Sequence, residues 1–545
     1  MGTESSVVID AFDDPATLDP HKAFETGSRH PVLNLYQGLL GLTDDDEFRP
    51  LLAAAEPEAT PHGDGWRVVV PVRKGIRFHD GTEMTADDVW YSVSRAAITA
   101  DGPAGLLADV LLGAPIDRLG AEDAAAMLRR ISRSGDELVL DLARPYAPLK
   151  HFLVHWSLVV SRSWCAARGE WDGSPGAVER FLNRGASALD DQANGTGPYR
   201  LEEWDRAARE LRFARWEQPG ARRGPAGIVL RSVDDRMERE KDLLAGACDF
   251  SVCQPESVQR LGDLGQTVLE KLPAEWSINP LAFIAQRVRP DSEFLGSGEF
   301  GPDGLRPDAF ADVHLRRMLP LCFDHERYVR EVLDGEGIPH IPPFPAPALP
   351  GTSPRPLARD LDRAAFEFRS AWGGEAARSG CRIVIATHGT NVSRARAAEF
   401  LADGLTRISP KITVEIFETD LPRLTELLYQ GKCPLVWAGW ASDFMHPHAF
   451  VSALLDPRAT LPSALGFRDE VLSGLVEAAR GAEGPLQEPV YRAIARYAED
   501  QAYYFAPPGK ISYMTYNKRW HGVRLMHQMS NVLDFSSFEE RVPAE

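Results

Sequence analysis

One short segment, WAGWASDFMHP at residues 437–447, gathers side chains that can bind a ligand. The carboxylate of Asp443 can hold an ammonium group through charge-assisted hydrogen bonds, and exclusion of water strengthens that attraction. The indole of Trp440 can attract a cation or stack on a planar group. The segment therefore favours a site in which Asp443 supplies a negative charge and Trp440 an aromatic wall.

Two other interpretations of this segment stay open. Asp443 can instead cap a helix at the turn before Pro447, because aspartate is a favoured capping residue. His446 and His448 flank Pro447 and can join Asp443 around a divalent ion, since imidazole and carboxylate suit several metals. Loop histidines that bind no metal are commoner, so we expect no metal site and no cofactor.

Other side chains that could perform catalysis favour structural roles. His79 and Asp80 suggest acid–base chemistry, but next to Phe78 they are better explained as hydrogen-bonding residues of a turn. His151 and His155 would share one face of a helix, yet no glutamate-containing zinc motif surrounds them. Motifs of serine hydrolases, nucleotide-binding loops and zinc proteases do not occur. Whether the chain is an enzyme stays open.

The composition is that of a large, acidic globular protein. Its 545 residues exceed what one hydrophobic core supports and are enough for two or three domains. A hydrophobic share of 44% and a charged share of 26% are typical of globular chains. The formal charge of -19 repels a phosphate backbone, so we expect no nucleic-acid partner.

The start of the chain and its apolar runs bear on targeting. No run approaches the ~20 residues that cross a bilayer, so we expect no transmembrane segment. Residues 1–6 lack the basic and apolar regions of a secretory signal. The sequence as written predicts a cytoplasmic protein, or a periplasmic or extracellular one if an export signal is missing from it. The six scattered cysteines predict reduced thiols.

Strand patterns alternate with helical ones, which predicts α/β layers. Residues 66–72 and 137–142 indicate strands, the second by its alternation of apolar and polar residues. Thr85 and Asp88 resemble a capping box at the start of a helix over about 86–98. Two stretches rich in glycine and proline predict packed surface loops: 296–307 and 337–356.

Five segments, in this order along the chain, resemble the motifs of one known family. The longest and most specific is RKGIRFHDGTEMTADDV at residues 73–89. The others are Leu18-Asp19-Pro20 with the NLYQGL segment at 34–39, GTGPY at 195–199, the helix-like segment 313–333 with Asp324, and WAGWASDFMHP. Together they resemble the peptide-type (family 5) extracellular solute-binding proteins of ABC importers over essentially the whole chain.

The resemblance implies a two-lobed α/β protein with the periplasmic-binding-protein-like fold (type II, peptide-binding cluster) and an extra domain. Lobe one would be discontinuous, formed by residues 1–43, 186–273 and 503–545. Lobe two would comprise residues 274–502, and the extra domain residues 44–185. The resemblance also implies an interlobe ligand cleft that closes like a Venus flytrap.

The resemblance further implies which residues line that cleft. In peptide-binding relatives, the aspartate of a Gly-Trp-x-x-Asp pattern pairs with the free amine of the ligand, and Asp443 matches it, preceded by Gly439 and Trp440. Trp437 stands where oligopeptide binders can carry a basic side chain that meets a carboxylate. We therefore expect a ligand site of Asp443, Trp440, Gly439 and Trp437. A small, aromatic or carboxylate-poor amine fits it better than an ordinary peptide.

These features give two functional hypotheses. In the first, the chain is the substrate-binding component of an ABC importer, a monomer that binds an amine-bearing small molecule or short peptide and delivers it to a permease. In the second, it is a signal-less cytosolic homologue that acts as a biosynthetic enzyme or sensor on an amine-bearing small molecule, either aromatic or not. The sequence identifies neither the ligand nor a reaction.

Overall fold

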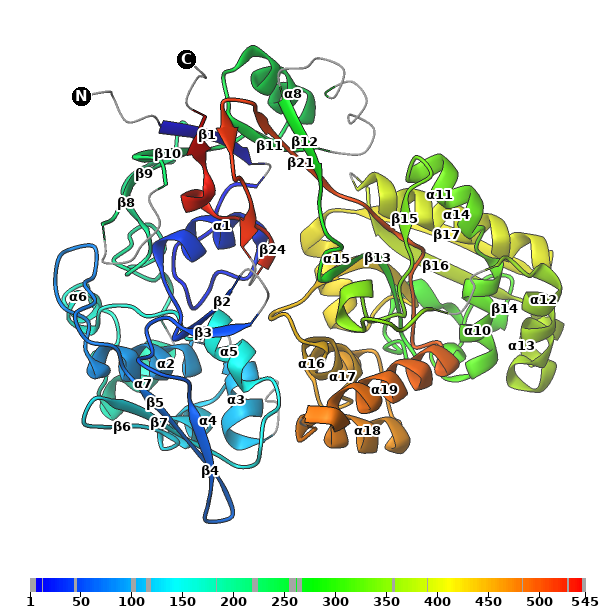
Figure 1. The fold of residues 1–545 in the computed structure, drawn as a ribbon. Helices are drawn as coiled ribbons and strands as arrows, with labels where there is room; N and C mark the ends of the chain where they lie inside the picture. The colour runs from blue at the N-terminus through cyan, green and yellow to red at the C-terminus, as the bar shows by residue number, and fades with distance from the viewer. Residues whose placement is uncertain are drawn as a thin grey trace. The chain divides into compact units, whose positions relative to one another are not determined.

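The chain forms two compact units in the computed structural model (Figure 1). Unit 1 comprises residues 1–272 and 512–545, and unit 2 comprises residues 273–511. The predicted α/β class is confirmed, whereas the predicted boundaries of the lobes and of the extra domain stay predictions. The structure describes residues 6–11, 13–43, 47–99, 104–113, 119–182, 184–217, 224–253, 261, 267–354, 358–389, 391–482, 484–526 and 529–541.

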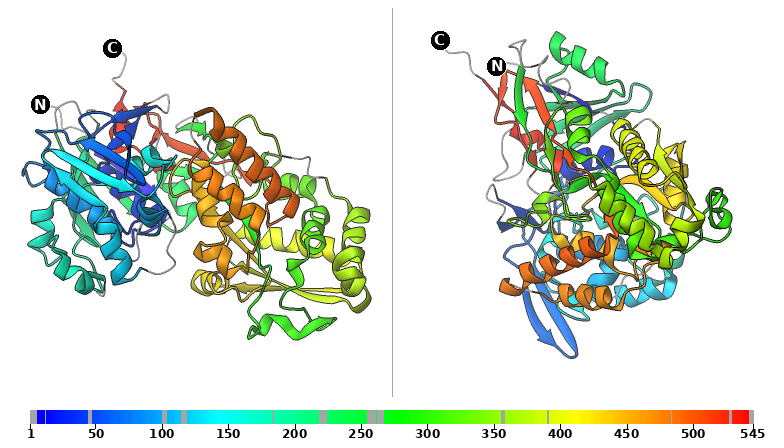
Figure 2. Two further views of the ribbon diagram at one scale, coloured as in Figure 1. Left: turned by 90° about the horizontal axis from the view of Figure 1, so that it is seen from below. Right: turned by 90° about the vertical axis from the view of Figure 1, so that its right-hand side faces the viewer.

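A mixed sheet forms the centre of unit 1. Among the described residues its order is β12 (Thr267–Lys271), β21 (Tyr513–Asn517), β11 (Phe250–Cys253), β1 (Ser6–Ala11), β10 (Gly227–Ser232), β9 (Glu210–Arg215) and β8 (Tyr199–Asp205). Strand β1 pairs in parallel with β10 and β11. Figures 1 and 2 show the red strand β21, from the end of the chain, in the sheet that also holds the blue β1. The helices α1 (Thr26–Leu35) and α8 (Arg236–Ala245) belong to this part.

A second sheet of unit 1 contains the elements expected from the sequence. Its order is β4 (Glu58–His62), β5 (Gly65–Pro71), β7 (Glu137–Leu142) and β6 (Ile131–Ser134). Strand β5 ends at its proline, and β7 has the predicted bounds. The carboxylate of Asp88 accepts a hydrogen bond from the backbone N–H of Thr85 (2.9 Å), which starts α2 (Ala86–Ala97). Both strands and the helix are therefore confirmed.

The remaining elements of unit 1 are short. The helices are α3 (Ala104–Leu112), α4 (Ala121–Leu128), α5 (Leu149–His155), α6 (Arg162–Ala166) and α7 (Val178–Leu182). The paired strands are β2 (Leu40–Leu42) with β3 (Phe48–Pro50), β22 (Trp520–His521) with β25 (Glu539–Glu540), and β23 (Leu525–Met526) with β24 (Met529–Leu533).

Two of the sequence motifs meet in unit 1. The ring of His79 accepts a hydrogen bond from the backbone N–H of Gly195 at Nδ1 (3.2 Å) and lies 3.1 Å from the carbonyl of Gly197 at Nε2. This arrangement needs the tautomer with a proton on Nε2. Asp80 and Asn194 exchange two hydrogen bonds of 3.1 and 3.0 Å. His79 and Asp80 therefore join the turn to the GTGPY segment, which confirms their structural interpretation.

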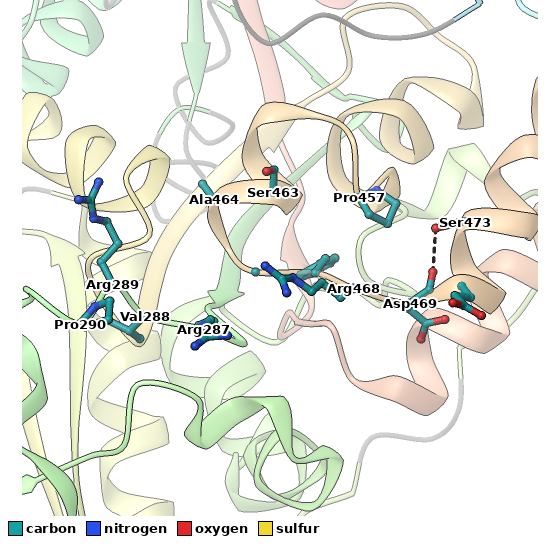
Figure 3. Close-up of a pocket in the computed structure, with 13 residues that line it drawn as sticks. Arg287, Val288, Arg289, Pro290, Pro457, Ser463, Ala464, Arg468, Asp469 and Ser473 are labelled. Atoms are coloured by element: carbon teal, nitrogen blue, oxygen red, sulfur yellow. Dashed lines mark hydrogen bonds between the residues drawn. The ribbon is translucent and has the colours of Figure 1, made fainter.

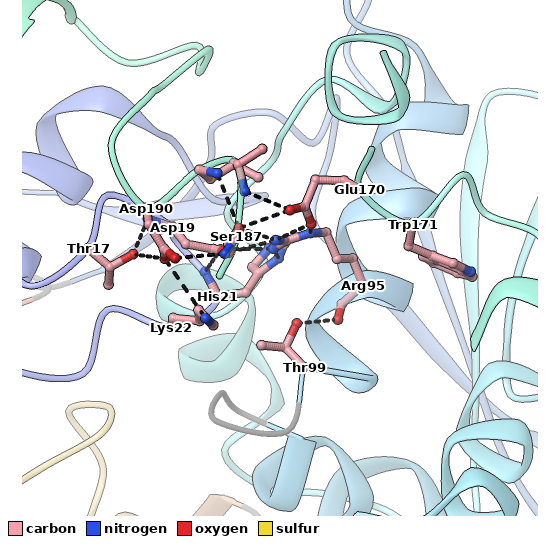
Figure 4. A network of polar contacts seen from close by, with 12 residues as sticks. Thr17, Asp19, His21, Lys22, Arg95, Thr99, Glu170, Trp171, Ser187 and Asp190 are labelled. Carbon is pink, nitrogen blue, oxygen red and sulfur yellow. Dashed lines mark hydrogen bonds and ion pairs between the residues drawn. The ribbon is translucent and has the colours of Figure 1, made fainter. Parts of the chain in front are cut away.

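A buried charge network joins distant segments of unit 1 (Figure 4). The guanidinium of Arg95 on α2 donates to both carboxylate oxygens of Asp19 (2.8 and 2.6 Å) and to Glu170 (2.9 Å). Asp19 and Arg95 are fully buried. Burial alone would raise the pKa of Asp19, but Arg95, with help from His21 and Ser187, outweighs it and holds that pKa well below its usual range. The Leu18-Asp19-Pro20 motif thus binds α2, the helix that begins within the longest motif.

Unit 2 is built on a sheet with the order β17 (Ile412–Thr419), β16 (Cys381–His388), β18 (Leu435–Ala441), β13 (Ser277–Ile284) and β19 (Tyr504–Phe505). Strands β17 and β18 run parallel to β16, whereas β13 runs antiparallel to β18. The three parallel strands are rich in isoleucine, valine and other apolar residues because helices cover them. The helix α14 (Val392–Ile408) follows β16, and α15 (Leu421–Tyr429) follows β17.

The other helices of unit 2 complete its core. They are α10 (Val313–Cys322), α11 (His325–Val332), α12 (Leu361–Ser370), α13 (Glu375–Ser379), α16 (Pro447–Phe450), α17 (Thr460–Ala464), α18 (Glu470–Arg480) and α19 (Gln487–Gln501). Further short strands are β14 (Gly296–Gly301), β15 (Gly337–Ile338) and β20 (Gly509–Lys510).

Two local expectations for unit 2 need correction. The segment 313–333 is two helices rather than one, because the carboxylate of Asp324 accepts from the backbone N–H of Arg327 (3.1 Å) and starts α11. The glycine-rich stretch 296–307 contains the strand β14, where Gly296 and Gly298 adopt positive φ angles. Along the described part of the chain, no helix combines the length and apolar character needed to cross a membrane.

Candidate functional site

The candidate site follows from the topology of the unit 2 sheet. The chain leaves β16, the middle one of the three parallel strands, for β17 on one side and then returns to β18 on the other side. In α/β sheets, ligands bind outside the carboxyl ends of strands where the connections diverge in this way. At that edge lie the first turn of α14, after β16, and the segment 442–446, after β18. The edge thus brings Asp443 and the start of α14 into one region of unit 2.

The segment 442–446 is held in a defined conformation. The backbone N–H of Ser442 donates to the carbonyl of Trp276 (2.9 Å), and that of His446 donates to the carbonyl of Phe444 (2.7 Å). The ring of His446 accepts from the backbone N–H of His448 (3.1 Å) and so caps α16. The capping role is therefore filled by His446, and the alternative in which Asp443 caps this helix is not supported.

Asp443 and Trp440 are half-buried neighbours at the end of β18. Burial raises the pKa of Tyr429, and the negative charge of Asp443 adds to this effect. The indole of Trp440 packs at the margin of the core, and its N–H is shielded from solvent without an acceptor among the described residues. The role of Asp443 and Trp440 in ligand binding stays a prediction.

The other two predicted residues lie on the opposite face of the strand from Trp440, because side chains alternate along β18. Trp437 is buried in the core, where its ring packs edge-on against Phe505 with centroids 5.5 Å apart. Its indole N–H also lacks an acceptor within the described part of the chain. Gly439 is half-buried and leaves room for the side chain of Arg394. Trp437 thus contributes to packing and does not lie at the surface beside Asp443.

Sequence reasoning missed Arg394, which lies in the first turn of α14. Its Nε donates to the side-chain oxygen of Asn279 on β13 (2.9 Å). Its Nη2 lies 2.9 Å from the point where a Cβ at residue 439 would stand. Arg394 and Gly439 are far apart in sequence, and no motif links them. Only the pairing of β13, β16 and β18 brings the guanidinium to this edge.

The structure gives no support for a metal at this site. Across the described residues, no group of three or more metal-ligating side chains comes together. Both ring nitrogens of His446 have protein neighbours, since Nε2 lies 3.0 Å from the side-chain nitrogen of Gln487. The cysteines whose side chains are described are free and buried: Cys165, Cys248, Cys322, Cys381 and Cys433. The side chain of Cys253 lies outside the described part.

A separate hollow of about 660 Å³ opens on unit 2 (Figure 3). It is lined by Arg287, Arg289, Arg468, Asp469, Phe467 and neighbouring residues, which follow β13 or precede α18. Because β13 is antiparallel to β18, with Ile284 opposite Leu435, this hollow lies at the other edge of the sheet from Asp443. Its rim mixes charges, and Asp469 already accepts hydrogen bonds from Tyr497 and Tyr503.

Comparison with solved structures identifies the same fold in binding proteins. The periplasmic binding protein DppA from Helicobacter pylori, in complex with peptide STSA, superposes with a TM-score of 0.76 at 18% identity, over 98% of each chain. The binding protein AgaA from A. tumefacien R10, in complex with agropinic acid, has a TM-score of 0.72 at 16% identity, over 99% of each chain.

Comparison of sequences agrees with this result. The glutathione-binding protein GsiB of Shigella boydii is 28% identical over 247 residues, which are 45% of this chain and 41% of the relative. The chain thus aligns with less than half the length of that curated relative. The profile of the bacterial extracellular solute-binding proteins, family 5, matches residues 47–461. Because this match covers most of the sequence, the chain belongs to the bacterial extracellular solute-binding proteins of family 5.

Proposed function

We propose that this chain binds an amine-bearing small molecule or short peptide at the carboxyl edge of β16 and β18. Asp443 holds the ammonium group, and Trp440 forms the adjacent wall. The observation that carries this proposal is the position of Asp443, half-buried after β18 while His446 caps α16. A partly desolvated carboxylate attracts a cation more strongly than an exposed one does.

Membership of family 5 supports a role in import. The chain would capture its ligand outside the cytoplasm, as a monomer, and present it to the permease of an ABC importer. Its relatives include a protein solved with a peptide, one solved with agropinic acid and a glutathione-binding protein. Members of this family thus differ in ligand, so the ligand of this chain must be inferred from its own side chains.

The proposal predicts the effect of Asp443→Ala and Asp443→Asn on ligand affinity. A library of dipeptides and tripeptides, in free and N-acetylated forms, serves as the probe, and affinity is measured by native mass spectrometry and calorimetry. Free amines should bind the wild-type protein, and each variant should lose about 1.5–3 kcal/mol of binding free energy, because a hydrogen bond between two charged groups is removed. That loss corresponds to about a tenfold to a hundredfold increase in Kd.

The control is Asp403→Asn, which removes a half-exposed carboxylate from α14 in the same unit. It should leave affinity unchanged. Equal binding of free and N-acetylated peptides by the wild-type protein, or full affinity in Asp443→Ala with a lowered Tm, would show that Asp443 has a structural role and that the amine is not recognised there.

A further inference from the structure

Three exposed arginines line the hollow of about 660 Å³ on unit 2 (Figure 3). Arg287 and Arg289 follow β13, and Arg468 precedes α18. Arg289 forms an ion pair with Asp291 (3.1 Å). The side chains of Arg287 and Arg468, by contrast, make neither a hydrogen bond nor an ion pair with any residue that the structure describes. Two positive charges at this hollow are therefore uncompensated within the described part of the chain.

Two other surface arginines of unit 2 show the contrast. Arg407 lies 2.9 Å from the carboxylate of Asp403, and Arg423 lies 2.7 Å from that of Glu426. Such partners are expected in this chain, because its formal charge of -19 leaves carboxylates in excess. The two uncompensated arginines beside one hollow are thus a local feature of this surface rather than the result of a shortage of acidic residues.

Arg287 and Arg468 come from two chain segments in direct contact. The backbone N–H of Arg287 donates to the carbonyl of Leu465 (3.2 Å), and a Cβ at Gly466 would stand 2.7 Å from the Cβ of Arg287. Gly466 is two residues before Arg468, and two residues of extended chain span at most ~7 Å. Figure 3 shows Arg468 pointing toward the side on which Arg287 lies. Both long side chains can therefore reach one small group in the hollow.

The acidic residues of the lining do not supply the missing negative charge. The carboxylate of Asp469 accepts from the backbone N–H of Leu472 (2.9 Å) and from two tyrosine hydroxyls, so it is directed to the start of α18. Figure 3 shows it on the opposite side of the segment from the guanidinium of Arg468. Glu470 is exposed in the first turn of α18, and the described ion pairs include none between it and either arginine.

Much of the remaining lining is apolar. Val288 and Phe467 are buried, and Pro290, Pro457 and Ala464 extend the apolar part. A volume of about 660 Å³ is typical of small-molecule sites. A stable protein interface needs about 800 Å² of surface on each partner, which is more than one such hollow offers. The hollow therefore fits a small organic molecule better than a bare ion or a protein surface.

We infer that this hollow is a second binding site, which takes a small organic phosphate. A phosphate monoester carries a charge of about -1.5 to -2 near neutral pH and has three strong acceptor oxygens. One such group can accept from the guanidinium groups of Arg287 and Arg468 together and compensate both charges. The apolar lining then contacts the organic part. The site lies at the other edge of the sheet from Asp443, so the inference does not rest on the proposed amine site.

The test measures binding of phenyl phosphate to the full chain by calorimetry. Arg287→Gln and Arg468→Gln should each weaken binding about tenfold to a hundredfold, which is the value of a charge-assisted hydrogen bond. The control is Arg407→Gln, which removes a paired surface arginine of the same unit and should leave the affinity unchanged. All three side chains are exposed, so the variants should fold, and circular dichroism checks that they do.

Two further probes separate the charge of the ligand from its organic part. Inorganic phosphate has the charge without the ring, and phenyl sulfate has the ring with a single negative charge. Both should bind more weakly than phenyl phosphate, because each lacks one of the two interactions.

Four results would overturn the inference. Phenyl phosphate does not bind, or its affinity is the same in both arginine variants as in the wild-type protein. Arg407→Gln weakens binding as much as the other two variants do, which would indicate attraction to positive charge in general. Phenyl sulfate or inorganic phosphate binds as tightly as phenyl phosphate. A tetraglutamate peptide binds while phenyl phosphate does not, which would assign this surface to an acidic protein partner.

Discussion

Replacement of Arg95 by methionine is expected to lower the free energy of unfolding of unit 1 by about 3–5 kcal/mol, because it leaves buried carboxylates without their counter-ion. Asp19 is fully buried and Glu170 nearly so, and both bind the guanidinium directly. Arg184 still hydrogen-bonds Glu170 but lies 3.7 Å from Asp19, so Asp19 is the group that loses most. Denaturation with guanidinium chloride, followed by circular dichroism, measures the change.

Two further variants identify the cause of that loss. Arg133→Met removes a surface arginine of unit 1 that pairs with Asp87, and it should cost less than ~1 kcal/mol. Arg95→Met combined with Asp19→Asn removes a buried charge of each sign, so the double variant should be more stable than Arg95→Met alone. If the double variant is the less stable of the two, burial of an uncompensated charge is not the cause.

Acidification below pH 6.5 is expected to destabilise both units, because buried histidines are held neutral in the folded state. Burial lowers the pKa of His21, His30, His325 and His340 to about 4 and that of His155 further still. An unfolded histidine titrates near ~6.5, so the unfolded state binds more protons between about pH 6.5 and 4. The free energy of unfolding therefore falls as the pH falls through this window.

The expected loss of unfolding free energy on acidification is large because several histidines act together. Each histidine contributes about 1.4 kcal/mol per pH unit within the window, so His21, His30 and His155 alone remove about 4 kcal/mol from unit 1 by pH 5.5. A folded domain commonly has only about 5–15 kcal/mol in total. Asp13 and Asp10 act in the opposite direction, since burial raises the pKa of both and that of Asp13 to about 6, but they are two groups against several.

The measurement is urea denaturation at a series of pH values from 7.5 to 5. His325→Phe removes one buried histidine from unit 2, whose ring packs among Phe323 and Phe505. This variant should reduce the slope of unfolding free energy against pH by about 1.4 kcal/mol per pH unit. His521→Gln changes a surface histidine and should leave the slope as it is. Constant stability from pH 7 to 5 would contradict the prediction.

The sequence predicted local elements well because their signals are local. The capping box at Thr85 and Asp88 and the alternation in residues 137–142 contain all the information that starts α2 and forms β7. The motifs also located the segment after β18 that contains Asp443. The contacts between motifs could not be predicted, since the pairs Asp19 with Arg95 and His79 with Gly195 join residues far apart in the chain.

Only part of the candidate site could be predicted, because some of its contacts join segments far apart in the chain. Trp440 and Asp443 follow from one segment, but the capping role of His446 depends on the course of the chain into α16. Arg394 reaches Gly439 only through strand pairing, and a glycine in a strand gives no sign of which side chain fills its space. No single segment therefore indicates that this guanidinium lies beside β18.

The position of β21 in the unit 1 sheet has a consequence for synthesis of the protein. Strand β21, at residues 513–517, lies between β11 and β12 and pairs with both, so β12 is not joined to the sheet until nearly the whole chain has been made. Residues 273–511 form a continuous unit and can fold as soon as they emerge. Until β21 has been made, β11 presents an open strand edge, which is a surface for misassembly and for chaperone binding. The half of the protein that is translated first is thus the half that completes its folding last.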